Sequence, residues 1–158
     1  MENTESISRK VLLTVWVAGL FDGEGTIGIY IHKRKDRENP RVTKHITIEN
    51  TNSLVIEEYK KFLRENNIKF YYCYLPSRKN RISSPIYSVN VSSYRMCEKL
   101  LNLLFPYLVG KKEQAQTMLD FIQYKKEIGW QTPVLKLEEF VNKIKQQKKS
   151  PETIRQTS

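Results

Sequence analysis

Apolar residues recur at helical spacing near the start of the chain, and the pattern then changes abruptly to strict alternation. In SRKVLLTVWVAGLFD the recurring positions are Val11, Leu12, Val15, Trp16, Gly19 and Leu20. This spacing predicts a helix over residues 9–22. In the following TIGIYIHKR, the residues on one face are Ile27, Ile29 and Ile31, and those on the other are Thr26, Gly28, Tyr30 and His32. Such alternation predicts a half-buried strand.

A second strand with the same alternation follows the charged turn KRKDRENP. In RVTKHITIE, one face carries Val42, Ile46 and Ile48. The opposite face carries Arg41, Thr43, His45 and Thr47. The two strands are expected to pair as an antiparallel hairpin with one apolar face and one polar, basic face.

The remaining pattern predicts a helix, a second pair of strands and three or four further helices. A helix is expected over 50–67, capped by Asn52 or Ser53, and strands over 68–75 and 85–93, joined by a basic turn. Further helices are expected over 92–105 before Pro106, over 110–128 ending near Gly129, over 132–147, and in the tail 150–158. Two hairpins whose apolar faces meet the helices describe an α+β fold, with a mixed sheet covered by helices on one side.

Length and charge narrow the choice of partner. The chain has 158 residues, which suits one domain over 1–158. Lys and Arg number 27 against 17 Asp and Glu, a formal net charge of +10, which favours nucleic acid or an acidic membrane surface. No apolar run approaches a membrane span, and the polar MENTESISRK resembles neither a secretory signal nor a lipidation site. We therefore expect an intracellular protein that does not bind a membrane.

Cysteine and histidine are too sparse to build a zinc site. The chain has Cys73 and Cys97, which we expect to be buried or half-buried reduced thiols, and two histidines, His32 and His45. No CxxC or HxxxH spacing is present. Any bound metal is therefore expected to be a hard cation held by oxygen ligands.

The junction WVAGLFDGEG concentrates glycines where the first helix meets the first strand. Gly19 and Gly23 lie four residues apart on one helix face, with Val15 one turn earlier, and small residues at this spacing allow a second helix to approach closely. Gly25 suits a left-handed exit from the helix. The glycines alone leave an alternative open, in which Gly19 packs under the protein's own sheet and the other two simply end the helix.

Two acids, Asp22 and Glu24, lie at the same junction. This is the negative end of the predicted helix, where a carboxylate is disfavoured by about 0.3–1 kcal/mol. A cation would relieve that repulsion, and carbonyl groups left free at the helix end are suitable further ligands for a hard divalent ion.

The nine residues VAGLFDGEG resemble the LAGLIDADG motif of homing endonucleases. The matching positions are Ala18, Gly19, Leu20, Asp22 and Gly25, with Glu24 as the second acid, a variant that the family also uses. The single motif, the length and the order of elements resemble the homodimeric branch of that family. The resemblance implies an α-β-β-α-β-β-α fold with additional C-terminal helices and a concave antiparallel sheet that binds DNA.

The same resemblance implies a homodimeric, intron-encoded, site-specific DNA endonuclease that makes a double-strand cut in a long pseudo-palindromic target. It places Val15, Gly19 and Gly23 in the dimer interface and brings two Glu24 carboxylates together. Glu24 and the main-chain carbonyl of Gly23 are then the ligands of Mg²⁺, or of another hard cation such as Mn²⁺ or Ca²⁺.

Three further residues, Lys111, Asn50 and Asp22, also have expected roles. The segment PYLVGKKEQA resembles the part of the family that carries a basic active-site residue, which implies that Lys111 stabilises the phosphate electrostatically. Asn50 aligns with a residue that orients solvent, although a cap or turn role is equally compatible with its position. For Asp22 we expect a structural hydrogen-bonding role near the helix end.

Target recognition is expected on the polar face of the sheet, in the major groove of the DNA. The strand residues expected there are Tyr30, His32, Arg34, Arg41, Thr43, His45, Thr47, Ser88 and Asn90. The basic turn residues expected to bind phosphates are Lys33, Lys35, Arg37, Arg78, Lys79 and Arg81.

Two other functions agree with the same features. A relative that has lost cleavage would act as an RNA-splicing maturase or as a sequence-specific DNA-binding regulator, and RNA would then be a partner. A basic α+β scaffold associated with ribosomes would have the charge without the dimer. The carboxylate of Glu24 and the presence of Lys111 favour the endonuclease.

Overall fold

The computed structural model describes residues 2–32, 40–76, 84–129 and 133–148. It begins with helix α1 (Glu2–Glu24), strand β1 (Gly25–His32), strand β2 (Arg41–Asn50) and helix α2 (Ser53–Glu65). Strand β3 (Tyr71–Leu75), strand β4 (Ile86–Val91) and helix α3 (Tyr94–Leu104) follow, and then a short 3-10 helix η1 (Phe105–Tyr107). Helices α4 (Lys112–Ile128) and α5 (Val134–Gln147) complete this part of the chain. The order confirms the predicted α-β-β-α-β-β-α arrangement with additional C-terminal helices.

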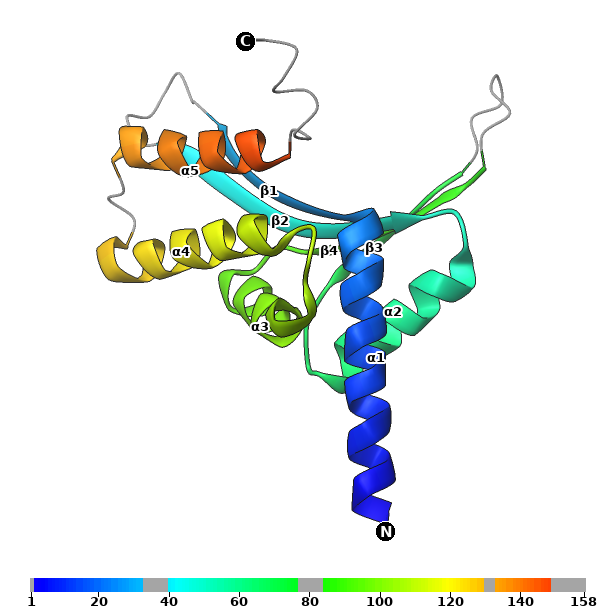
Figure 1. Ribbon diagram of the computed structural model, residues 1–158. Helices are drawn as coiled ribbons and strands as arrows, with labels where there is room; N and C mark the ends of the chain where they lie inside the picture. Colours follow the sequence, from blue (N-terminus) through cyan, green and yellow to red (C-terminus); the bar gives the residue numbers. More distant parts are fainter. Residues whose placement is uncertain (1, 33–39, 77–83, 130–132, 149–158) are drawn as a thin grey trace, which may run out of the picture.

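The described strands form one sheet in the order β1-β2-β4-β3, and each neighbouring pair is antiparallel. The prediction of a mixed sheet was therefore wrong, because the contact between the two hairpins, β2 with β4, is antiparallel as well. Figure 1 shows the sheet curved, with α1 to α4 below it and the concave face turned the other way. Helix α5 packs against α4 and the edge strand β1.

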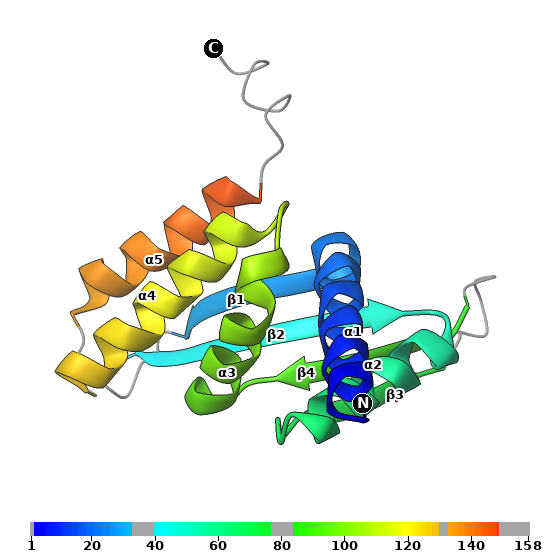
Figure 2. The same cartoon turned by 60° about the horizontal axis from the view of Figure 1, so that its bottom comes forward.

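One hydrophobic core lies between the sheet and the helices. The predicted apolar face of β1 and β2 supplies Ile27, Ile29, Ile46 and Ile48, all buried. Buried residues of α1 (Val17, Ala18 and Phe21) and of the other helices pack against them. Figure 2 shows how these helices cross the underside of the sheet one after another. These helices thus cover one face of the sheet and leave the opposite face uncovered by them.

Two element boundaries differ from the prediction. Helix α1 runs from Glu2 to Glu24 instead of 9–22. The apolar pattern marks only the part of the helix that packs against the protein. The polar residues before that part contain no glycine or proline that would stop a helix. Strand β3 begins at Tyr71 instead of residue 68. There the N–H of Ile68 donates to the carbonyl of Leu63 at 2.8 Å and Asn67 has φ 52°, so these residues end α2.

The two cysteines lie in different surroundings. Cys97 is buried on α3, donates to the carbonyl of Val91 at 3.2 Å, and has a pKa raised to about 12, mainly by burial. Cys73 is exposed on β3, so the prediction that it is at least half-buried was wrong. Its strand is the last of the sheet and, over its described length, has every residue exposed.

Within the described ranges, no helix has both the length and the apolar character needed to span a bilayer.

Candidate active site and nucleic-acid interface

The second half of α1 has one buried face and one exposed apolar face. Its outward side carries Val15, 43% exposed, and Trp16, 41% exposed, followed by exposed Gly19 and Gly23. A Cβ atom added at either glycine would meet nothing within 4 Å. The alternative in which Gly19 packs under the protein's own sheet is therefore wrong. The fold of one chain does not require glycine at these two positions.

Gly25 follows directly and has a different role from the predicted one. It is the first residue of β1, and among the described glycines the positive φ belongs to Gly129. A Cβ at Gly25 would overlap the ring and the carbonyl oxygen of Phe21. The predicted left-handed exit was wrong, because the helix passes straight into the strand. Glycine is needed there so that the strand can pass close to the last turn of α1.

The side chain of Asp22 ties the end of α1 to the start of α4. Its Oδ2 accepts from the N–H of Val109 at 2.8 Å, and its Oδ1 accepts from the N–H of Lys111 at 2.9 Å. The Nζ of Lys111 donates in turn to the main-chain oxygen of Asp22. Both carboxylate oxygens of Asp22 are thus engaged within the chain, in agreement with the expected structural role.

We expect Asp22→Asn to lower the free energy of unfolding by about 1–2 kcal/mol, because an amide nitrogen cannot accept one of the two backbone hydrogen bonds. Urea unfolding of both proteins measures this. The matched control is Asp120→Asn, since Asp120 is an exposed acid that accepts from Gln116 on its own helix. The control should change stability by less than about 0.5 kcal/mol. Equal losses in the two variants would contradict the structural role of Asp22.

Glu24 is the last residue of α1 and is exposed. Since Gly25 pairs with Ile48, the register places Glu24 beside the Glu49–Asn50 end of β2. Lys111 is held at the same place through Asp22. The described residues contain no group of three His, Cys, Asp or Glu side chains arranged to hold a metal. One chain thus presents the exposed carboxylate of Glu24 beside the strand end that carries the exposed acid Glu49, with Lys111 bonded to the helix end close by.

Asn50 reaches the same end of the sheet but is partly engaged. Its Oδ1 accepts from the N–H of Asn52 at 2.8 Å, and Asn52 in turn caps α2 by accepting from the N–H of Leu54 at 3.0 Å. The prediction of Asn52 or Ser53 as the cap is therefore resolved in favour of Asn52. The turn role considered for Asn50 is present, which leaves its amide nitrogen for solvent.

The concave face of the sheet carries the residues predicted to read DNA, as the strand registers show. Those on β1 and β2 are Tyr30, His32, Arg41, Thr43, His45 and Thr47, and those on β4 are Ser88 and Asn90. Thr47 pairs with Asn90 across the two hairpins, so these positions form one continuous surface. Arg34, Lys33, Lys35, Arg37, Arg78, Lys79 and Arg81 lie outside the described residues.

A stacked pair of rings lies on the part of this face that β1 and β2 form. The rings of Tyr30 and His45 lie 5.0 Å apart with an interplanar angle of 15°. Both rings lie over Gly28, where an added Cβ would come within 2.9 Å of His45 Nε2 and 2.5 Å of the Tyr30 ring. His32 Nε2 and Thr43 Oγ1 are 2.9 Å apart further along. Glycine at position 28 thus allows a flat aromatic platform on the concave face.

The pKa of His45 is lowered from 6.5, first by burial of the ring and second by the positive charge of Lys148. The unfolded chain therefore binds this proton more readily than the folded protein, so the stabilisation is complete above pH 6.5 and is lost as the pH falls through the folded pKa. We expect the free energy of unfolding to fall between pH 7.5 and 5.5, and to fall less in His45→Gln. Urea titrations at both values test this, with His32→Gln as control. An unchanged pH dependence in His45→Gln would contradict it.

Some residues on or near this face escaped the sequence pattern. Tyr71 pairs with Asn90 and Cys73 with Ser88, so β3 extends the concave face, but alternation within β3 could not reveal which strand it pairs with. Glu49 pairs with Ser88 on the same face and is an exposed acid. Lys44 lies on the opposite, apolar face with its Nζ 3.5 Å from the centre of the Tyr94 ring, and burial lowers its pKa. Lys44 is thus a basic residue of β2 that does not lie on the concave face.

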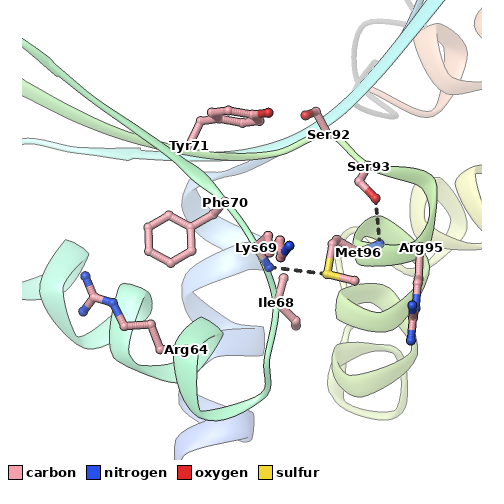
Figure 3. A pocket seen from close by; sticks show the side chains of 9 residues that line it. All are labelled: Arg64, Ile68, Lys69, Phe70, Tyr71, Ser92, Ser93, Arg95 and Met96. Atoms are coloured by element: carbon pink, nitrogen blue, oxygen red, sulfur yellow. Dashed lines mark hydrogen bonds between the residues drawn. The ribbon is translucent and has the colours of Figure 1, made fainter.

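An open pocket of about 910 Å³ lies away from Glu24, between the end of α2 and the start of α3 (Figure 3). The residues that line it are Arg64, Ile68, Lys69, Phe70, Tyr71, Ser92, Ser93, Arg95 and Met96. The hydroxyl of Ser93 accepts from the N–H of Met96, and the N–H of Lys69 contacts the Met96 sulfur at 3.4 Å. The first of these contacts caps α3, and the second joins the segment before β3 to α3.

Comparison with known proteins identifies the fold. No protein-family model matches the sequence, and no curated protein matches it. One similar structure is a crystal structure of the homing endonuclease I-CvuI with a DNA target and 2 mM Mg, in which the DNA is not cleaved. It superposes with a TM-score of 0.71 and 23% sequence identity, and the match covers 90% of this chain and 85% of that chain. The archaeal intron-encoded homing endonuclease I-Vdi141I, complexed with DNA, gives a TM-score of 0.69 and 15% sequence identity. That match covers 87% of this chain and 84% of that chain.

A third similar structure belongs to a longer chain. The LAGLIDADG homing endonuclease I-GzeII, in complex with its DNA target, gives a TM-score of 0.60 and 18% identity over 83% of this chain but 43% of that one. These structural neighbours are LAGLIDADG homing endonucleases, and the fold of this protein is the LAGLIDADG homing endonuclease fold. The predicted fold is confirmed.

Proposed function

We propose that the protein is a site-specific DNA endonuclease that acts as a homodimer with a hard divalent cation, Mg²⁺ being the expected one. The observation that carries this proposal is the position of Glu24. Its free carboxylate lies where the exposed glycine face of α1 ends and the concave face of the sheet begins. The fold comparison supports the proposal, since the neighbours with this fold are homing endonucleases bound to DNA.

The outward face of α1 supports a dimer through that helix. Val15 and Trp16 expose apolar surface to solvent, and Gly19 and Gly23 continue the same face without a side chain. Close packing against a second copy explains both features, because glycine lets two helix backbones approach. A two-fold contact along this face places the two Glu24 residues near each other. The match to 43% of the longer I-GzeII chain agrees with one copy being half of such an assembly.

The ligands that one chain contributes suit a hard cation. They are the carboxylate oxygens of Glu24 and the main-chain carbonyl of Gly23, and oxygen ligands favour Mg²⁺, Mn²⁺ or Ca²⁺. Two facing carboxylates repel each other unless a cation lies between them. When bound, such an ion supplies an activated water and stabilises the charge of the phosphodiester. Crystals of I-CvuI with DNA contained 2 mM Mg in one case and 2 mM Ca in another.

Two further side chains act on the reacting phosphate. Lys111, held by Asp22 at the end of α1, supplies positive charge beside Glu24 and stabilises the negative charge that develops on the phosphate. The amide nitrogen of Asn50 remains available to orient a water molecule, since its oxygen is bound to Asn52. Asp22 takes no part in the chemistry, because both of its oxygens are engaged.

The concave face supplies target recognition. A two-stranded ribbon fits the major groove, where the four base pairs present different hydrogen-bonding groups. Polar side chains of β1 and β2 such as Thr43 and Thr47 face outward there, together with the Tyr30–His45 platform. A two-fold dimer doubles this surface, which predicts a long and partly palindromic site. The basic turn residues, Lys33, Lys35, Arg37, Arg78, Lys79 and Arg81, would bind phosphates.

The test uses a pool of randomised duplex DNA and sequencing of the ends that the protein generates. We expect cuts at one long, partly palindromic sequence when Mg²⁺ is present and none in EDTA. Specific binding of one sequence without any cut would contradict the endonuclease and favour the inactive DNA-binding relative. Binding of structured RNA in preference to duplex DNA would instead favour the maturase.

A further inference from the structure

The pocket between the end of α2 and the start of α3 gathers three basic side chains. Arg64 belongs to the last turn of α2, Lys69 to the segment before β3, and Arg95 to the first turn of α3. All three are exposed, and none of the described residues that line the pocket is acidic. Figure 3 shows the two arginines on opposite sides of the pocket, with Lys69 between them. Three separate segments thus bring positive charge to one hollow of about 910 Å³.

These three charges have no acidic partner within the described ranges. The ion pairs found there join Lys60 to Glu57, Lys126 to Glu98 and Lys136 to Glu139. Arg64 contacts a ring instead, since its guanidinium carbon lies 5.7 Å from the centre of the Phe70 ring. Like charges around one hollow repel one another and attract an anion from outside the chain.

The aromatic residues of the pocket offer a second kind of contact. Tyr71 is 73% exposed, although it is the first residue of β3. In Figure 3 its ring lies across the upper side of the pocket and points toward Ser92, with Phe70 below it. An exposed ring beside unpaired lysine and arginine side chains suits a ligand that has both flat bases and phosphates.

A single strand of nucleic acid fits this pocket better than a duplex does. In a duplex the faces of the bases are stacked inside and cannot reach Tyr71, whereas an unpaired base can turn outward and stack on an aromatic ring. The pocket also lies at the β3 edge of the sheet, the edge farthest from β1. An acidic peptide would match the charges but would leave the ring of Tyr71 without a stacking partner.

We propose that this pocket binds a segment of single-stranded RNA or DNA, with one base stacked on Tyr71 and the neighbouring phosphates bound by the three basic side chains. The pocket is separate from Glu24 and from the Tyr30–His45 platform. The inference therefore goes beyond the endonuclease activity and does not depend on it.

The test measures binding of short fluorescent oligouridylate and oligothymidylate strands by anisotropy over a range of salt concentrations. Tyr71→Ala should weaken binding about tenfold, the effect expected for the loss of one stacked base. Tyr107→Ala is the matched control, because Tyr107 is a partly exposed tyrosine outside the pocket, and it should leave the affinity unchanged. Lys69→Ala should lower the slope of log K against log salt by about 0.7, the contribution of one phosphate of a single strand. Lys143→Ala removes an exposed lysine of α5 and should keep the parental slope.

An abasic strand of the same length separates stacking from charge. The parent should bind it about tenfold more weakly than oligothymidylate, and Tyr71→Ala should bind it as the parent does. Equal affinity of the parent for the two strands would overturn the inference. Displacement of the strand by oligoglutamate as readily as by unlabelled oligothymidylate would also overturn it and favour an acidic peptide.

Variants of the concave face locate the bound strand. His32→Gln changes a residue of that face and should leave the single-strand affinity unchanged. A loss in His32→Gln as large as the loss in Tyr71→Ala would place the strand on the concave face and overturn the inference, as would parental binding in both Tyr71→Ala and Lys69→Ala. Tighter binding of either oligouridylate or oligothymidylate supports the pocket and shows which sugar it prefers. Cleavage of the selected duplex by the parent is measured separately, so failure of the pocket leaves the proposed function in place.

Discussion

Replacing Glu24 with glutamine is expected to abolish cleavage while DNA binding stays the same or becomes tighter. Glutamine keeps the shape of the side chain but loses the charge that holds a divalent cation. Metal assistance is worth several kcal/mol, and each 1.36 kcal/mol is a tenfold change in rate, so the loss should reach about 1000-fold or more. Removing two like charges near the DNA phosphates should not weaken binding, because they repel the DNA in the absence of metal. Single-turnover cleavage and a binding titration measure the two effects separately.

Glu65→Gln is the matched control for this substitution. Glu65 is the last residue of α2 and is exposed, so it is also a carboxylate at the negative end of a helix. It lies on a different element from the glycine face of α1, and its replacement should leave cleavage unchanged. If Glu24→Gln cut the selected duplex as fast as the parent, the assignment of Glu24 as a metal ligand would be wrong.

Much of the fold was predictable because most elements carry their own periodicity. Strict alternation identified β1 and β2 and the face of each that is buried, and Gly129 marked the end of α4. The errors occurred where a distant contact decides the local conformation. The position of Gly25 in the sequence suggested that it ends the helix. In the structure, glycine is needed there because a Cβ atom would overlap the ring of Phe21.

The candidate site was predictable only in part, for a related reason. The acids and glycines of the junction are adjacent in the chain, so their pattern is visible in the sequence. The contact between Asp22 and Lys111 joins residues 89 positions apart. No local pattern encodes such distances. The resemblance to a known motif suggested Lys111, and the hydrogen bonds that hold it at the end of α1 emerged only from the structure.

If two copies dimerise along α1, Gly19→Ala should stabilise the folded monomer and weaken the dimer. Gly19→Ala should raise the free energy of unfolding of the monomer by about 0.5–1 kcal/mol, because alanine favours a helix and its Cβ meets nothing in the chain. The same methyl group lies where the partner helix must approach. Overpacking costs about 1–3 kcal/mol, so the dimer should dissociate about tenfold more readily, and cleavage should fall with it. Urea unfolding of dilute protein and sedimentation equilibrium measure the two effects.

A second variant and a control separate the interface from general surface effects. Trp16→Ala removes apolar area from the same face of α1 and should weaken the dimer without a methyl group being added. Leu135 is 76% exposed on α5, so Leu135→Ala removes a comparable exposed apolar side chain from a surface outside the proposed interface and should leave association unchanged. If Gly19→Ala stabilised the chain and dimerised as tightly as the parent, two copies would not meet along this helix. Glu24 would then have no second carboxylate beside it, and the shared metal site would have to be abandoned.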